Sequence, residues 1–166
     1  MESGKDYGLV PVGLGARDTL RLEKGYLLSG QDFLWPGLGI HPDESLPTGF
    51  LSRDTAETAV PFGLDMDHDF VGRSRVLSSL DSDVKWHGLR CLDRGPAPRL
   101  GHAVKSSDDD KSEIIGYVTS GCPSPSLSRT GIAMAYLNNT EIGAEVWIQA
   151  SPRRRVRAEV VRPPFV

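Results

Sequence analysis

The sequence lacks the features that mark membrane-spanning, disulfide-rich or nucleic-acid-binding proteins. No apolar run approaches the roughly 20 residues that a membrane-spanning helix needs, and the first residues carry neither an apolar signal core nor an arginine-rich transit pattern. Two cysteines among 166 residues are too few for a disulfide framework, so we expect Cys91 and Cys122 to be free thiols. A net charge of −3 gives no broad positive surface, so we expect no nucleic acid and no membrane among the partners.

Glycine and proline, in contrast, are frequent. The chain has 18 Gly and 12 Pro, which favour many turns and short strands over long helices. Apolar residues make up 39% and charged residues 25%, a composition typical of globular proteins. A chain of this length suffices for one domain, or for one small domain with part of another.

The first half of the chain predicts two helices and a long loop. Residues 16–24 suit a helix that ends at Gly25, and Arg17 and Arg21 share one of its faces because they are four residues apart. Residues 74–80 suit a second, short helix. Between them, residues 34–58 are rich in Pro, Gly and acidic side chains with scattered apolar residues, which predicts a surface loop.

From residue 84 onward the pattern predicts a β domain. Short runs of alternating or continuous apolar character are separated by turn-forming residues, with no long helix between them. Such a series is typical of an antiparallel barrel or sandwich. The predicted strands cover residues 85–92, 113–119, 132–137, 145–149 and 156–161.

Five segments, in this order and at this spacing, resemble the C-terminal half of the glycine cleavage T-proteins. Two of them, Gly13–Glu23 and Gly116–Leu127, are long and specific. The others are short and match at the expected places: Gly30–Asp32, Asp69–Arg73 and Pro163–Val166. The resemblance covers nearly the whole chain apart from residues of about 34–56.

The resemblance implies an α+β fold that is mostly β. Members of that family have three domains around a central folate channel, and the last domain is a small antiparallel β-barrel. Residues 84–166 are accordingly expected to form the barrel domain, and residues 1–83 a C-terminal remnant of the folate-binding core. Within that remnant, residues of about 33–56 look like an insertion, in which Trp35 could replace a tryptophan that the family carries where Met66 stands.

The resemblance also implies an activity and its partners. The family transfers the aminomethyl carbon of lipoylated H-protein to tetrahydrofolate, which gives methylene-tetrahydrofolate and ammonia. Its catalytic carboxylates lie in the N-terminal half, so none is expected in this chain, and the chain alone is expected to be inactive. The expected partners are H-protein, tetrahydrofolate and the N-terminal half. The expected compartment is the mitochondrial matrix in a eukaryote or the cytoplasm in a prokaryote.

Two residues are predicted to bind the folate. Arg17 matches the family arginine of the Gly-Leu-Gly-Ala-Arg-Asp motif, and a guanidinium can hold a carboxylate and also face a ring. Tyr26 matches a position that is often aromatic in the family, and a tyrosine can contact a flat ring on one side and water on the other. The alternatives are a surface arginine in the first helical turn and a core tyrosine at the helix end.

Other chemical groups have simpler explanations. Asp18 and Glu23 do not face each other on a helix, so Glu23 is expected to pair with the face of Arg21 or with a neighbouring strand. Residues 65–69 suggest a solvated turn because a calcium loop would need a Gly and a final Glu; no metal site is expected. Cys122, without a nearby His or Lys, is expected to be structural, and Ser124-Pro125-Ser126 a rigid loop.

Two questions stay open on sequence grounds. Arg153-Arg154-Arg155 with Arg157 fits either a solvated hairpin turn or a contact with H-protein. The function could also be that of a folate-dependent demethylase relative, acting on dimethylglycine, sarcosine or a sulfonium compound, or that of a non-catalytic barrel used for interactions.

Overall fold

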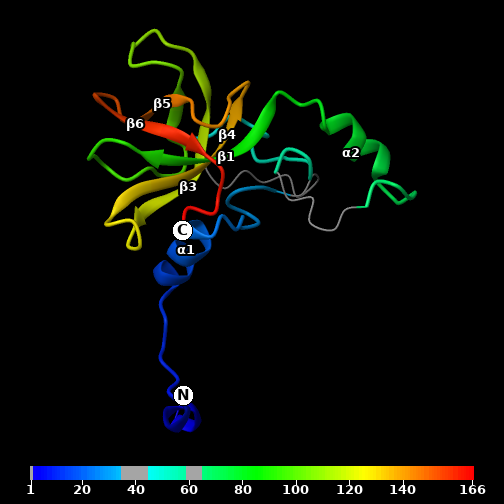
Figure 1. Ribbon diagram of the computed structural model, residues 1–166. Helices are drawn as coiled ribbons and strands as arrows, with labels where there is room; N and C mark the ends of the chain where they lie inside the picture. Colours follow the sequence, from blue (N-terminus) through cyan, green and yellow to red (C-terminus); the bar gives the residue numbers. More distant parts are fainter. Residues whose placement is uncertain (1, 35–44, 59–64) are drawn as a thin grey trace.

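The computed structural model describes residues 2–34, 45–58 and 65–166 (Figure 1). A β-barrel forms the body of the molecule, and helix α1 (Leu14–Glu23) lies against it beside the C-terminus. Helix α2 (Arg73–Ser79) extends to the other side. In the described part of the chain, no helix has the length and apolar character needed to cross a bilayer.

The barrel confirms the predicted β domain. Six antiparallel strands close it in the order β1-β4-β3-β2-β5-β6. Its interior is filled by buried aliphatic side chains from alternate strand positions, among them Leu89, Val118 and Ile148, which are fully buried. The strands are β1 (Val84–Cys91), β2 (Ala103–Lys105), β3 (Ile114–Ser124), β4 (Thr130–Asn138), β5 (Glu145–Ser151) and β6 (Arg154–Val161).

Two details of the barrel differ from the prediction. Strand β3 continues to Ser124 rather than ending at Thr119, because Pro123 and Ser124 still pair with Gly131 and Thr130 of β4. The expected Ser-Pro-Ser loop therefore begins one residue later, after Ser124. Strand β2 was not predicted, since three residues are too short to show an alternating pattern.

Helix α1 ends where the sequence indicates. Gly25 adopts φ +76°, and its N–H donates to the carbonyl of Leu22 at 2.9 Å. The N–H of Tyr26 donates to the carbonyl of Arg21 at 2.8 Å, which completes a Schellman motif. The fully buried Leu22 packs with Ile132 and Met134 on the outer face of the barrel.

Glu23 joins α1 to the barrel. Its side chain is 4% exposed, and its carboxylate accepts hydrogen bonds from the Ser124 hydroxyl at 2.5 Å and from the N–H and hydroxyl of Ser126 at 3.1 and 2.9 Å. Its carbonyl accepts from the N–H of Phe165 at 2.8 Å. Of the two expected partners, the neighbouring strand is the one observed.

Residues 45–58 form an irregular loop, as predicted, but part of this loop is buried rather than lying on the surface. Leu46 and Leu51 are buried, and the Phe50 ring packs edge-on against Tyr117 at 5.2 Å between ring centres. The segment is irregular, and its lack of periodicity concealed the burial of these apolar side chains. Trp35, in the predicted insertion, lies outside the described residues.

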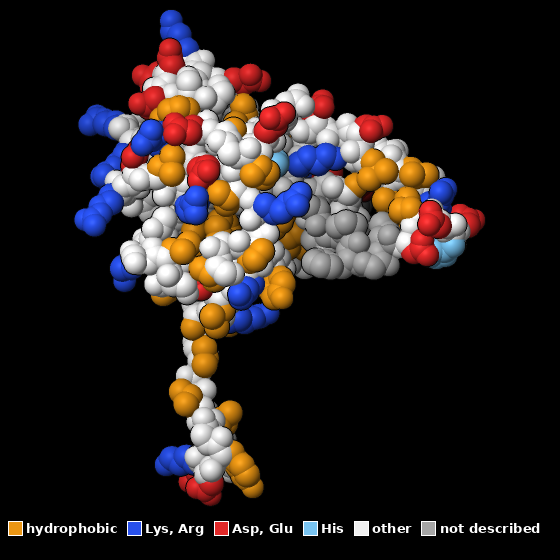
Figure 2. Space-filling model, viewed as in Figure 1, with side chains coloured by type: hydrophobic (Ala, Val, Ile, Leu, Met, Phe, Trp, Pro, Cys, Tyr) orange, Lys and Arg blue, Asp and Glu red, His pale blue; other side chains and the backbone are white. Residues whose placement is uncertain are grey.

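The N-terminal arm leaves the body of the molecule. The 3-10 helix Glu2–Tyr7 and the extended residues 8–13 project beyond α1 (Figure 1). Apolar side chains line this arm (Figure 2), and Tyr7, Val10 and Leu14 are 89%, 71% and 81% exposed. Exposed apolar groups in such a row are typical of a surface that binds another polypeptide.

We expect Glu23→Gln to destabilise the chain by about 1–2 kcal/mol near neutral pH, because the buried Ser124 hydroxyl and the Ser126 donors would lose a charged acceptor. Hydrogen bonding from Ser124 lowers the pKa of Glu23 from its ordinary value of 4.5, against the opposing effect of burial. The carboxylate therefore stabilises the fold above pH 4.5, and this contribution is lost as the pH falls through the lowered pKa.

Urea unfolding as a function of pH measures this effect, with the exposed Glu113→Gln as the matched control. The difference between wild type and Glu23→Gln should shrink in acid, while the control follows wild type throughout. A difference that stays constant from neutral to acidic pH would contradict the assigned role of the ionised carboxylate.

Candidate functional site

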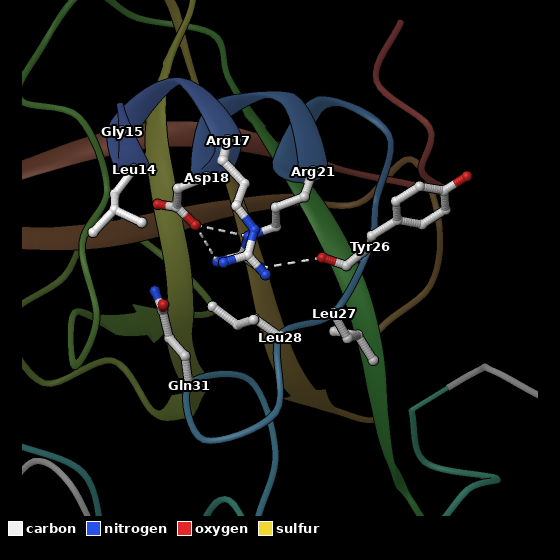
Figure 3. Close-up of a pocket in the computed structure, with 9 residues that line it drawn as sticks. All are labelled: Leu14, Gly15, Arg17, Asp18, Arg21, Tyr26, Leu27, Leu28 and Gln31. Atoms are coloured by element: carbon white, nitrogen blue, oxygen red, sulfur yellow. Dashed lines mark hydrogen bonds and ion pairs between the residues drawn. The ribbon is translucent and has the colours of Figure 1, made fainter. Parts of the chain in front are cut away.

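A hollow of about 560 Å³ lies beside α1 (Figure 3). Its volume falls within the range of small-molecule sites, roughly 300–1,000 Å³. One side carries two arginines and an aspartate from the helix, and leucines with a glutamine from the following segment form the rest. The lining residues are Leu14, Gly15, Arg17, Asp18, Arg21, Tyr26, Leu27, Leu28 and Gln31.

Arg21 is fixed in the wall of this hollow. Its side chain is 11% exposed, and it forms ion pairs with Asp32 and, at 2.7 Å, with Asp18. It also donates to the Ser120 hydroxyl at 2.8 Å and to the carbonyl of Tyr26 at 3.2 Å. These bonds connect α1 to the segment after it and to strand β3. Because they occupy the donors of the guanidinium, Arg21 is not available to a ligand.

Asp32 is the centre of this network. It is fully buried, and its carboxylate accepts from the N–H of Leu28 at 2.9 Å and from the hydroxyls of Thr119 and Ser120 at 2.6 and 2.5 Å. Adjacent residues of a regular strand point to opposite faces, but the register of β3 shifts between Val118 and Ser120. This bulge lets both hydroxyls reach one carboxylate oxygen.

Arg17, unlike Arg21, is not held by neighbouring side chains of the described residues. It lies on the same face of α1 as Arg21, lines the hollow and is exposed. Among the described residues, no carboxylate or carbonyl accepts a hydrogen bond from its guanidinium. A guanidinium that faces a hollow without a partner can bind a carboxylate or another oxygen-rich group of a ligand.

Tyr26 contributes mainly its backbone to the hollow. Its carbonyl accepts the bond from Arg21 at 3.2 Å, while its ring is 65% exposed and points away from the two arginines (Figure 3). The ring therefore stands at the rim, where it can contact a ligand that extends outward.

The other candidate residues are placed elsewhere or occupied. Glu23 is held by Ser124 and Ser126 and does not face the hollow, and Asp18 pairs with Arg21. Within residues 2–34, 45–58 and 65–166, no group of three or more His, Cys, Asp or Glu side chains could hold a metal ion. Cys122 is free and buried, and its burial raises the pKa of the thiol.

Comparison with known proteins decides the family. The family described as "Glycine cleavage T-protein C-terminal barrel domain" matches residues 85–166. A crystal structure of glycine cleavage system aminomethyltransferase T from Bartonella henselae superposes with a TM-score of 0.71 and 29% identity, over 98% of this chain and 41% of that one. The chain belongs to the glycine cleavage T-protein family.

Curated relatives of the T-protein family support the same assignment. The chain is 37% identical to the aminomethyltransferase of Halothermothrix orenii, over 100% of its own length and 42% of the relative. It is 35% identical to the probable aminomethyltransferase of Pyrococcus horikoshii, over 99% of its own length and 39% of that relative. The chain thus spans about two fifths of the length of these T-protein relatives.

The sequence patterns did not identify Arg21 and Asp32 as the ion pair in the wall of the hollow. Arg21 was recognised only as a neighbour of Arg17, and Asp32 only as the end of the short Gly30–Asp32 motif. A signal existed in the two motifs to which they belong, but their common partner Ser120 is 99 residues from Arg21. No local pattern could join residues so far apart.

We expect Asp32→Asn to destabilise the chain by about 3 kcal/mol, since the buried Arg21 loses one of its two carboxylate partners. Arg17→Gln should change the free energy of unfolding by less than about 0.5 kcal/mol, because an exposed side chain without a described partner is removed. Chemical denaturation of both variants tests the contrast between the two positions. Equal effects of the two substitutions would show that the assigned division of roles is wrong.

Proposed function

We propose that this chain is part of an aminomethyltransferase that moves the aminomethyl carbon of lipoylated H-protein to tetrahydrofolate, with methylene-tetrahydrofolate and ammonia as products. The observation that carries the proposal is the Arg17 guanidinium, which lines the hollow beside α1 and has no partner among the described residues, in a chain whose relatives are named aminomethyltransferases. The folate supplies the one-carbon acceptor, and this chain supplies binding, orientation and exclusion of water.

The hollow suits a flat heterocycle with a charged tail. Leu27 and Leu28 provide an apolar surface for a ring, and Gln31 provides an amide that can donate and accept hydrogen bonds. Arg17 can hold a carboxylate by two parallel hydrogen bonds. Tyr26 stands at the rim, where its ring can pack on the part of the folate that leaves the hollow.

The remaining wall belongs, in this proposal, to the N-terminal half of the T-protein. The hollow is open to solvent along α1, and the apolar arm that precedes α1 has no described cover, with Val10 and Val12 71% and 66% exposed. Burying such side chains against a second polypeptide is favourable by about 25 cal/mol for each Å². The catalytic carboxylates are expected on that N-terminal half.

Tetrahydrofolate binding tests the shared pocket. Calorimetry should give weak or no binding to residues 1–166 alone, and binding should appear when the N-terminal half is added. Strong binding by residues 1–166 alone would contradict the shared wall. Turnover of aminomethylated H-protein, compared with dimethylglycine, sarcosine and a sulfonium donor, separates aminomethyl transfer from the demethylase alternative.

In the reassembled protein we expect Arg17→Gln to weaken tetrahydrofolate binding by roughly 10- to 100-fold, because a charged hydrogen-bond donor is lost. The matched control is Arg153→Gln, an exposed arginine outside the hollow, which should leave affinity unchanged. If Arg17→Gln binds tetrahydrofolate as wild type does, the guanidinium does not contact the ligand.

A further inference from the structure

The barrel carries a second hollow, away from the lining of the first. It measures about 650 Å³ and is formed by the loop after β1 and the tight turn between β3 and β4. The turn lies close to the C-terminal end of α1, since Ser126 donates to Glu23, but the two hollows share no lining residue. Its polar groups include Arg94, Arg129 and the Thr130 hydroxyl.

In the described part of the chain, the two arginines of this hollow lack the carboxylate partners that Arg90 and Arg155 of the barrel have. Arg90 pairs with Glu159, and Arg155 pairs with Asp108 and Asp110. Neither Arg94 nor Arg129 has a carboxylate partner among the described residues. Two guanidinium groups on one hollow without such partners leave a local excess of positive charge in a chain whose net charge is −3.

Little in the hollow neutralises that charge. Asp93 is the only acidic residue in its described lining, and its carboxylate already faces Arg157 at 3.5 Å. Burial, with the nearby Asp93 carboxylate, raises the pKa of the Cys91 thiol to about 11, so this thiol is neutral near pH 7. The hollow therefore favours an anion.

The backbone at Arg129 has an unusual, left-handed conformation. The N–H of Thr130 donates to the carbonyl of Leu127 at 2.9 Å, which closes a β-turn around Ser128 and Arg129 within the loop of residues 125–129. Both central residues are left-handed, with φ 53° for Ser128 and 65° for Arg129. Two successive positive φ values favour Gly and Asn, so Arg129 occupies a backbone position that disfavours it, and such strained positions cluster at functional sites.

We propose that Arg94 and Arg129 form a binding site for a small anion that carries two oxyanion groups, either phosphates or carboxylates. One group would be held by each guanidinium, in the bidentate geometry that arginine offers to such oxygens. The Thr130 hydroxyl lies in the same lining and can donate to a remaining oxygen. The hollow is larger than a single phosphate requires, which is why the proposed ligand has two charged groups.

Titration of the 166-residue chain with pyrophosphate and with citrate, followed by calorimetry and by amide chemical shifts, tests this site. Acetate at matched ionic strength controls for general screening. Shifts should concentrate at the loop after β1 and at residues 128–131. Binding of pyrophosphate alone identifies a phosphate ligand, binding of citrate alone identifies a carboxylate ligand, and binding of both supports the shared chemistry.

The turn itself supplies a matched pair of variants. Arg129→Gly suits the left-handed backbone and removes the guanidinium, so it should fold at least as stably as wild type and bind roughly 10- to 100-fold more weakly. Ser128→Gly suits the same turn and keeps the guanidinium, so its affinity should stay within about twofold. Arg94→Gln, outside the turn, should also weaken binding.

Three results would overturn the proposal. The first is that the wild-type chain binds neither anion, and the second is that Arg129→Gly binds as tightly as wild type. The third is an equal loss of affinity in Ser128→Gly and Arg129→Gly, which would show that the shape of the turn, and not the guanidinium, determines binding. If Arg129→Gly does not fold, as judged by circular dichroism, Arg94→Gln decides the question by the same affinity criterion. None of these measurements depends on folate or H-protein.

Discussion

The α1 side of this protein depends on a carboxylate that is out of contact with water. Burying an isolated charge costs several kcal/mol, and the cost is offset only when ion pairs and hydrogen bonds surround the group. Asp32 meets that condition with Arg21, with two hydroxyls of β3 and with the N–H of Leu28. The network links α1 and the segment directly after it to strand β3, 99 residues from Arg21 at Ser120, and so it places α1 on the barrel.

This network separates two arginines that look alike in the sequence. Arg21 points inward and is surrounded by acceptors, so it forms part of the wall. Arg17, one helical turn earlier, faces the hollow without a described partner. Because the wall is held by Arg21, the ligand proposed for Arg17 would bind without disturbing the fold. The second hollow is similar in this respect, since Arg94 and Arg129, like Arg17, have no carboxylate partner among the described residues.

The barrel and the end of α1 could be predicted from local signals, because alternating apolar residues and Gly25 act within a few residues. The family assignment followed from two long motifs and is supported by the comparisons. The packing of residues 45–58 and the Asp32 network could not be predicted. Leu51 carries no periodic signal, and the meeting of Asp32 with Thr119 and Ser120 depends on a bulge in β3.

The most direct test of this account is hydrogen exchange at the two arginine side chains, followed by nitrogen-15 NMR of the free chain. The Nε–H of Arg21 bonds to Asp18 at 2.7 Å within a side chain that is 11% exposed, so its proton should exchange slowly. The Nε–H of Arg17 should exchange at the rate of a solvated arginine. Equal, fast exchange at both side chains would contradict the claim that one arginine builds the wall and the other is left for the ligand.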